Sequence, residues 1–223
     1  MPAIIAIDGP AGAGKSTVAR KLARRLGYAM VDTGAIYRAV ALAAQRAGIA
    51  WDDDAGLTRL LEPGLPIAFG EHDEVSLGGE EITAAIRTPE MSRGASVVSA
   101  RPVVRARLLG LQRNLGRATE RGAVLEGRDI GTVVFPDATV KFFLTASDEA
   151  RARRRHAELA GKGHEVELSD VLNDQMRRDR NDSERAIAPL KPAPDAIIVD
   201  TTGLDLDEVV ERCFRAVRER VAA

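Results

Sequence analysis

GPAGAGKS, residues 9–16, is the stretch that decides the fold, because it matches the phosphate-binding pattern G-x-x-x-x-G-K-[S/T] in full. The apolar run AIIAI, residues 3–7, precedes it, and apolar residues with helical spacing follow it as far as Gly27. A buried strand, a glycine-rich turn and a helix with Gly27 as its C-cap are therefore predicted. A chance glycine-rich turn is the alternative reading, and the matching strand and helix weigh against it.

The alternation of strand and helix recurs along the chain. Four further apolar runs predict strands: YAMV (28–31), AVL (123–125), VKFFL (140–144) and AIIV (196–199). Residues with helical spacing follow the first of these and the last, where they extend over 205–221. We therefore predict an α/β protein, a P-loop three-layer fold with a five-stranded parallel sheet flanked by helices.

Three segments interrupt this alternation. Residues 63–86 hold short β-prone pieces between Gly, Asp and Glu, which predicts a small antiparallel β insert. Residues 147–182 are polar and helical, and the Gly-Lys-Gly sequence at 161–163 indicates two helices with a flexible elbow. The three prolines of IAPLKPAPD, residues 187–195, require an extended connector to the last strand.

Composition excludes several classes of protein. The 223 residues carry 32 basic and 33 acidic side chains, a net charge of −1, so neither nucleic acid nor an anionic membrane is expected as a partner. The single cysteine, Cys213, allows no internal disulfide and lies in a helical apolar pattern, which predicts a buried thiol and a reducing compartment. The N-terminal residues resemble neither a signal peptide nor a membrane span. We expect a cytoplasmic monomer.

The glycine-rich stretch predicts a binding site for the phosphates of ATP. Its glycines let backbone N–H groups converge on phosphate oxygens at a helix N-terminus. Lys15 would span the outer phosphates, and the Ser16 hydroxyl would be a ligand of Mg²⁺. The predicted ATP-binding residues of this loop are Gly9, Pro10, Ala11, Gly12, Ala13, Gly14, Lys15, Ser16 and Thr17.

A phosphate-binding loop alone leaves switches, motors, ATPases and small-molecule kinases open. A GTPase switch should also carry a guanine-reading N-K-x-D, and the sequence has none. The one D-x-x-G, DDAG at 53–56, is expected in a polar loop and not after an apolar strand. Both observations count against a switch.

Two more segments, DTGAIYR (32–38) and LEGRDIGT (125–132), begin where predicted strands end, at the sheet edge where open parallel sheets bind ligands. Each alone could be an ordinary strand-end loop. Together they bring arginines to this edge, and guanidinium groups hold phosphate by two hydrogen bonds at once. A kinase whose acceptor is already a phosphate needs such arginines and no general base, because phosphate is ionised at neutral pH.

RRDRNDSER, residues 177–185, has seven charged side chains in nine positions. Arg178, Asp182 and Arg185 are spaced i, i+4 and i+7, which predicts one stripe on a helix. Dense mixed charge is usually a solvated face, so whether this stripe faces water or a ligand depends on the rest of the chain. The other four charged residues are expected to form a solvated face or to support the stripe: Arg177, Asp179, Arg180 and Glu184.

These motifs resemble those of the bacterial cytidylate kinases, a family of nucleoside monophosphate kinases. The resemblance rests on IDGPAGAGKST (7–17), DTGAIYR, IRTPE (86–90), EGRDIGTVVFPDA (126–138) and RDRND with RAIAPL (178–190). It extends over nearly the whole chain. It implies transfer of the γ-phosphoryl group of ATP to CMP or dCMP, with Mg²⁺, in pyrimidine nucleotide metabolism.

The resemblance also implies a division of the chain and a role for each site residue. Residues 63–88 would be a monophosphate-binding insert and 151–165 a short helical lid, within a core of 1–62, 89–150 and 166–223. The catalytic residues would be Lys15, Arg128, Arg178 and Arg185. The CMP-binding residues would be Thr33, Tyr37, Arg38, Ser96, Arg105, Arg128, Asp129, Arg178, Asp182 and Arg185, where Ser96, Arg105 and Asp129 read cytosine, Tyr37 and Asp182 contact ribose, and the four arginines at 38, 128, 178 and 185 bind the acceptor phosphate. Arg151, Arg154 and Arg155 are lid candidates for the donor phosphates, with Arg154 assigned to ATP.

Two alternatives to a CMP kinase remain. The acceptor could be another monophosphate such as UMP, although uracil offers a carbonyl where cytosine offers an amino donor. A non-catalytic ATP-binding module is the other. The chain departs from many members of the family in having Glu126 where aspartate is common and Thr33 where serine is common. Asp8 and Asp32 could orient waters on Mg²⁺ or make structural hydrogen bonds.

Overall fold

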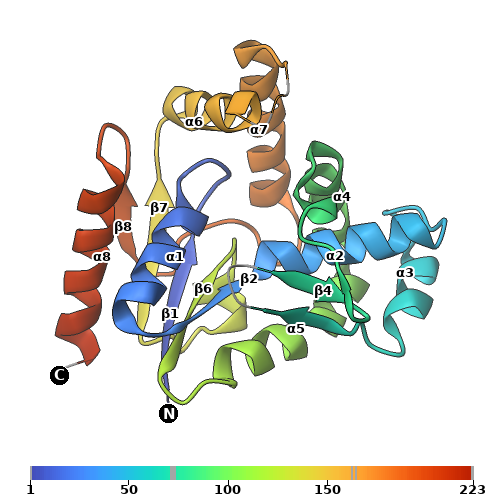
Figure 1. The fold of residues 1–223 in the computed structure, drawn as a ribbon, viewed down its shortest axis with the longest axis horizontal. Coiled ribbons are helices and arrows are strands. Elements are labelled where there is room, and N and C mark those ends of the chain that lie inside the picture. Colours follow the sequence, from blue (N-terminus) through green and yellow to red (C-terminus); the bar gives the residue numbers. More distant parts are fainter. Residues whose placement is uncertain (1, 71–73, 162, 164, 222–223) are drawn as a thin grey trace. The chain divides into compact units, whose positions relative to one another are not determined.

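The computed structural model describes residues 2–70, 74–161, 163 and 165–221 (Figure 1). The described strands are β1 (Ala3–Asp8), β2 (Ala29–Asp32), β3 (Ile67–Phe69), β4 (Val75–Leu77), β5 (Glu80–Glu81), β6 (Gly122–Glu126), β7 (Val140–Thr145) and β8 (Ile197–Asp200). The described helices are α1 (Lys15–Leu26), α2 (Thr33–Arg46), α3 (Asp54–Leu61), α4 (Pro89–Ser99), α5 (Pro102–Arg117), α6 (Asp148–Gly161), α7 (Leu168–Glu184) and α8 (Leu206–Val221), with short helical turns η2 (Ala85–Arg87) and η3 (Ile130–Val134). The chain forms two compact units, residues 31–115 and the remainder.

The main sheet has five strands, as predicted, and their order is β2-β6-β1-β7-β8. β1 pairs in parallel with β6 and β7, and β7 pairs in parallel with β8. Five of the six β1 residues are buried, which explains its unbroken apolar sequence, since a parallel strand is covered on both faces. All strands that the sequence predicted for this sheet are present, and β2 and β8 lie one residue further along the chain than expected.

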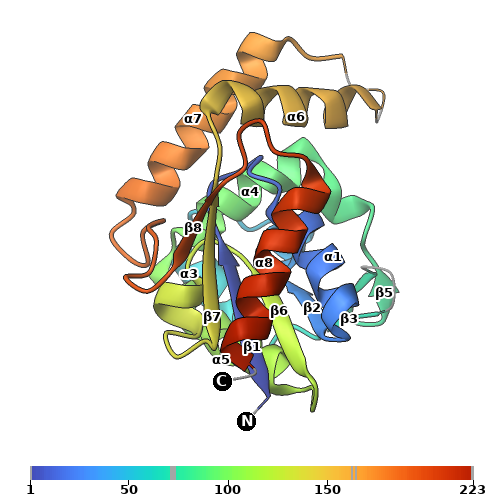
Figure 2. The ribbon, with the colours of Figure 1, turned by 90° about the vertical axis from the view of Figure 1, so that its left-hand side faces the viewer.

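Helices α1 and α8 pack against one face of this sheet in the first unit (Figure 2). Val18 and Leu22 of α1, Phe142 of β7 and Cys213 of α8 share one buried apolar cluster. Gly27 ends α1 in the left-handed conformation, as predicted. Burial raises the pKa of the Cys213 thiol to about 12, so this side chain is part of the core and not a nucleophile.

The second unit, residues 31–115, has its own apolar core around α2, α4 and the small sheet. The order β3-β4-β5 with antiparallel pairing confirms the predicted antiparallel β insert. Gly94 packs so close to Trp51 that a Cβ would lie 2.7 Å from its ring. Trp51 Nε1 also donates to the Ala41 carbonyl at 2.9 Å, which fixes the ring against α2.

Helix α3 corrects one expectation. DDAG, residues 53–56, does not lie in a loop but starts this helix, because the Asp53 side chain accepts a hydrogen bond from the Gly56 N–H at 3.0 Å. An aspartate that caps a helix already has a structural function, so the segment offers no support for a GTPase switch.

Helices α6 and α7 belong to the first unit, and the two helices that the Gly-Lys-Gly sequence predicted are present: α6 ends at Gly161 and α7 begins at Leu168. Lys162 of that sequence lies outside the described residues. Ala152, Leu159 and Val171 form a small apolar cluster between them. The limits 63–88 for a monophosphate-binding insert and 151–165 for a lid remain predictions. Among the described residues, no helix has both the length and the apolar character needed to cross a membrane.

Candidate active site

The glycine-rich loop between β1 and α1 depends on three glycines with positive φ. Gly9 has φ +144°, and a Cβ on it would lie 2.0 Å from the Leu144 carbonyl oxygen, a clash that backbone atoms cannot relieve. Gly12 and Gly14 have φ +74° and +87°, which is left-handed backbone that favours glycine. The loop is thereby closed tightly around the N-terminus of α1, with Ser16 and Thr17 exposed in its first turn.

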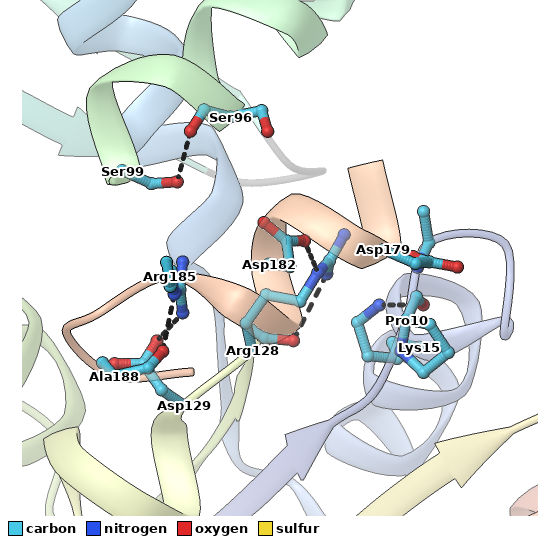
Figure 3. Close-up of polar contacts among 12 residues, drawn as sticks. Pro10, Lys15, Ser96, Ser99, Arg128, Asp129, Asp179, Asp182, Arg185 and Ala188 are labelled. Carbon is cyan, nitrogen blue, oxygen red and sulfur yellow. Dashed lines mark hydrogen bonds and ion pairs between the residues drawn. The ribbon is translucent and has the colours of Figure 1, made fainter. Parts of the chain in front are cut away.

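Lys15 lies within this loop and has an unusual charge environment. Its Nζ donates to the Pro10 carbonyl at 2.8 Å (Figure 3), and the residue is 6% exposed. Burial lowers its pKa to about 7, and the nearby Arg128 charge acts in the same direction. Glu126 and Asp8 partly offset both effects. An incoming anion would favour the charged form of Lys15.

The two aspartates with open roles both hold backbone groups. Asp8 accepts hydrogen bonds from Ile130 N–H and Gly131 N–H, each at 2.8 Å, and so ties the end of β1 to η3. Burial raises the Asp8 pKa to about 6, although these two bonds oppose the shift. Asp32 caps α2 through the Ala35 N–H and also accepts from Arg38 Nη2 at 2.7 Å. Structural hydrogen bonding is the role that these contacts favour.

Arg128 and Asp182 form a partly buried ion pair, with Arg128 Nε 2.9 Å from Asp182 Oδ2 (Figure 3). Burial alone would lower the pKa of Arg128, but the carboxylates of Asp182, Glu126 and Asp179 together outweigh it and the net direction is upward. Arg178 is one helical turn before Asp182 on α7, and its Nε is buried with no hydrogen-bond partner among the described residues. Burial and the charge of Arg128 lower its pKa. Two guanidinium groups thus repel each other here.

Arg185 corrects the predicted helical stripe. Helix α7 ends at Glu184, and Arg185 has extended backbone angles, φ −60° and ψ 139°. Its Nε donates to the Ala188 carbonyl at 2.6 Å, and its Nη2 lies 3.6 Å from Asp129 Oδ1 (Figure 3). Both side chains of the Arg185–Asp129 pair are 5% exposed. Arg185 is therefore placed by the turn after the helix and not by helical spacing.

The four other charged residues of the segment 177–185 divide into two kinds. Arg177 pairs with Asp174 on the surface and is 65% exposed, and Arg180 and Glu184 are also exposed, as expected of a solvated face. Asp179 differs, because its carboxylate contacts the glycine-rich loop at Ala11 and pairs with Arg151. Sequence reasoning did not single out Asp179 as a site residue.

The three arginines predicted for a lid take three different positions. Arg151 is 4% exposed and donates to the Ala11 carbonyl at 2.8 Å. Arg154 donates to the hydroxyl and carbonyl of Thr201, at 2.8 and 2.6 Å, and Thr201 Oγ1 in turn lies 3.4 Å from the Ala13 carbonyl. Arg155 pairs with Glu158 of its own helix. Arg151 and Arg154 therefore connect to the glycine-rich loop, and Arg155 does not.

The second unit contains the remaining predicted residues: Thr33, Tyr37, Arg38, Ser96 and Arg105. The Arg105 guanidinium lies over the Tyr37 ring, 5.7 Å from its centroid, and its Nη1 donates to the Ser99 carbonyl at 3.1 Å. The Ser96 carbonyl accepts from Ser99 Oγ at 3.1 Å (Figure 3). Arg105, Tyr37 and Thr33 are all buried. The structure thus brings Tyr37 and Arg105 together as one polar–aromatic cluster.

Gln112 is a further polar residue of this cluster that sequence reasoning missed. It is 2% exposed, and its Nε2 lies 3.5 Å from the Tyr37 hydroxyl and 3.3 Å from the Leu108 carbonyl. A buried glutamine beside a tyrosine hydroxyl can fix the orientation of the ring. Its signal in the sequence is weak, since a glutamine on a helix is ordinarily exposed.

A parallel sheet with a glycine-rich loop after β1, a buried loop lysine and a partly buried arginine after β6 defines the class of P-loop phosphotransferases. Within this class, the profile of one family, cytidylate kinase, matches residues 5–219. The chain belongs to this family and is a kinase.

Individual relatives agree with the family assignment. A cytidylate kinase of Geobacter sulfurreducens is 56% identical over 223 residues, which cover 99% of this chain and 94% of the relative. A cytidylate kinase of Chromobacterium violaceum is 46% identical over 220 residues, 99% of this chain and 97% of the relative. Among solved structures, an uncharacterized protein from Eubacterium ventriosum matches with TM-score 0.55 and 14% identity over 98% of this chain and 99% of its own. That likeness concerns the fold alone.

Proposed function

We propose that this kinase transfers the γ-phosphoryl group of ATP to CMP, and to dCMP, and releases ADP. One observation carries the proposal beyond family membership. Arg128 lowers the pKa of both Lys15 and Arg178, so its charge lies close enough to repel each of these two cations. Phosphate groups bound among them would relieve this repulsion, and a phosphoryl transfer between two phosphates requires such neutralisation.

The donor phosphates would bind in the glycine-rich loop, with its backbone N–H groups and Lys15 directed to them. Lys15 would leave the Pro10 carbonyl and gain a proton as the triphosphate enters. Arg154, which lies beside Thr201 and the loop, is the lid arginine proposed to reach ATP.

Mg²⁺ fits the residues at this loop. The described residues contain no cluster of three or more His, Cys, Asp or Glu that could hold a metal ion alone. Mg²⁺ bound with a nucleotide typically takes one or two protein ligands and completes its shell with phosphate oxygens and water. Ser16, exposed in the first turn of α1, would supply its hydroxyl. The bound ion would neutralise charge on the transferred phosphoryl group.

Four arginines would bind the acceptor phosphate: Arg38, Arg128, Arg178 and Arg185. Arg178 has an unbonded Nε, and Arg128 and Arg185 are already oriented by Asp182 and Asp129. Oriented guanidinium groups lose little entropy when the phosphate binds. Because the acceptor is an ionised phosphate oxygen, the step needs positioning and charge neutralisation and no general base.

The base and sugar would be read by the other CMP-binding residues. We propose that Arg105, Ser96 and Asp129 pair with the hydrogen-bonding edge of cytosine, and that Tyr37, Asp182 and Thr33 bind around the sugar and phosphate. A carboxylate, a guanidinium and a hydroxyl match the donor and acceptors of cytosine. Uracil would leave part of this set unpaired and should be the poorer substrate.

We further propose that the protein acts in the cytoplasm as a monomer, with ATP and CMP as its partners and no nucleic acid. The near-balanced charge and the buried, single cysteine support this proposal. Size-exclusion chromatography with light scattering would test the oligomeric state, and a dimer at micromolar concentration would contradict it.

The experiment that tests the function is a coupled assay of ADP release over CMP, dCMP, UMP, AMP and GMP. The proposal expects the highest kcat/KM for CMP, with dCMP next. A preference for UMP would favour the alternative acceptor. ATP binding without acceptor-dependent turnover would instead indicate a non-catalytic module.

A further inference from the structure

Asp179 on α7 lies beside the glycine-rich loop (Figure 3). Its Oδ1 accepts from the Ala11 N–H at 3.4 Å, and its Oδ2 accepts from Arg151 Nη1. Its side chain is 18% exposed, whereas Arg177 on the same helix is 65% exposed. The acidic side chain is therefore part of the loop's immediate surroundings.

Arg151 on α6 also contacts Ala11 of the loop, through the Ala11 carbonyl. Its Nη1 donates to the Ala11 carbonyl at 2.8 Å as well as to Asp179, its Nε donates to the Ala146 carbonyl at 3.2 Å, and its Nη2 pairs with Asp148. The N–H and the carbonyl of Ala11 are thus bound by two side chains that are themselves an ion pair. Four of the five guanidinium N–H groups are directed to protein oxygens, which leaves little of Arg151 for a phosphate.

The next residue of the loop is held by packing. A Cβ on Gly12 would lie 2.9 Å from the Arg151 carbonyl and 3.0 Å from Gln175 Oε1, so α6 and α7 contact this glycine directly. Gln175 is 4% exposed, and its Nε2 lies 3.4 Å from the Asp148 carbonyl, which joins the two helices. The shape of the loop at residues 11–12 therefore depends on two helices that are more than 130 residues away in the sequence.

We propose that Asp179 and Arg151 are positioning residues that set the conformation of the loop at Ala11–Gly12 for the donor phosphates. Phosphate recognition by backbone N–H groups depends on their directions, and misplacement by about 1 Å can cost ~100-fold in rate. Asp179 and Arg151 together bind the N–H and the carbonyl of Ala11 in this loop. Arg151 then acts through the loop and is not a phosphate ligand, in contrast to its place among the lid candidates.

The test variant is Asp179→Asn, which keeps an acceptor oxygen for Ala11 N–H and removes the charge that holds Arg151. Because the inference rests on the proposed use of ATP, steady-state kinetics are combined with direct binding of ATP by calorimetry. We expect KM for ATP and the ATP dissociation constant to rise by ~10-fold, while KM for CMP changes by less than about threefold. Arg151→Lys keeps the positive charge but loses the planar guanidinium group with its several N–H donors. This variant should also raise KM for ATP and the ATP dissociation constant.

Asp170→Asn is the matched control, because Asp170 lies on the same helix and its side chain is exposed. This variant should leave both KM values unchanged. If Asp179→Asn loses thermal stability but keeps its ATP affinity, the pair only stabilises the fold. If KM for ATP and KM for CMP change equally, the effect of the pair is not confined to the ATP site. Either result overturns the inference. If the wild type binds ATP but does not phosphorylate CMP, the proposed function fails, and the ATP-binding comparison still tests the positioning role.

Discussion

Ala188 has φ +52°, the one positive φ among the described residues other than glycine, and it precedes Pro189. A residue before proline prefers extended backbone, so this conformation is doubly unfavourable and must be maintained by its contacts. The turn directs the Ala188 carbonyl to Arg185 Nε at 2.6 Å. The unfavourable backbone conformation of Ala188 thus orients the Arg185 guanidinium, which lies beyond the end of helix α7.

Arg185→Ala should lower kcat/KM for CMP by at least ~100-fold, which is about 3 kcal/mol, the scale of a charge-assisted contact to phosphate. Coupled assays at saturating ATP measure this effect. Arg177→Ala is the control, because the Arg177 side chain is exposed and should be nearly neutral. Wild-type kinetics in the Arg185 variant would remove this residue from the acceptor site.

Ala188→Val should destabilise the protein by about 1–2 kcal/mol, because a β-branched residue tolerates positive φ poorly. It should also lower kcat/KM for CMP, since the carbonyl that orients Arg185 would move. Ala188→Gly is the matched variant and should keep both stability and turnover. Urea unfolding and CMP kinetics measure the two effects, and a Val variant equal to the wild type in both would show that the turn is not strained.

At the scale of elements, Asp8 joins β1 to η3, the turn that follows Arg128 and Asp129 in the chain. Asp8→Ala would leave two buried N–H groups without an acceptor and should lower the free energy of unfolding by about 2 kcal/mol or more. Asp53→Ala, which removes a single helix cap, should cost about 1 kcal/mol. Urea denaturation of both variants makes the comparison. A smaller loss for Asp8→Ala than for Asp53→Ala would contradict this account.

The elements that sequence predicts well are those whose pattern is local. The strands of the main sheet and helix α1 follow from apolar runs and from glycines at fixed places. Helices α3, α4 and α5 were not predicted, although Asp53 and the pair Thr88–Pro89 are recognisable start signals of the first two. Their short apolar faces serve the core of the second unit, which a search for strand and helix alternation overlooks.

The end of α7 and the direction of Asp179 illustrate the harder case. Nothing between Asp182 and Pro189 is a strong helix terminator, so the stripe of three charged residues was extended one residue too far. Val171, Gln175 and Asp182 are buried at helical spacing, and Asp179 falls on the same side. This pattern can be recognised only when a polar residue such as Gln175 is known to be buried. The burial of Gln175 depends on the tertiary fold and cannot be read from the local sequence.

At the scale of the molecule, the candidate residues divide between the two compact units. The first contains the loop lysine, Arg128, Asp129 and the charged residues of α7, and the second contains Tyr37, Arg38, Ser96 and Arg105. Each set is internally organised by ion pairs and buried hydrogen bonds before any ligand is bound. The family motifs supplied the roles predicted for most of these residues, whereas local patterns pointed to the glycine-rich loop and to the arginines that follow the strands.

Proton linkage should accompany ATP binding. Folding lowers the pKa of Lys15 from 10.5 to about 7. Between pH 7 and pH 10.5, Lys15 therefore binds fewer protons in the folded than in the unfolded protein. Its contribution to the stability of the ligand-free protein rises with pH across this range. Above pH 7, ATP binding should then take up a proton at Lys15. Calorimetry at pH 8 in buffers of different ionisation enthalpy measures this uptake. Lys15→Arg, which stays charged, should abolish it, and equal uptake in both proteins would refute the assignment to Lys15.

The most direct test of the central claim is the acceptor preference of the purified protein, measured as ATP-dependent ADP release with Mg²⁺ at pH 7.5. The account predicts that CMP gives the highest kcat/KM and that UMP falls below it by ~10-fold or more, because the uracil edge would leave buried polar groups unpaired. Equal or higher kcat/KM for UMP or AMP would contradict it.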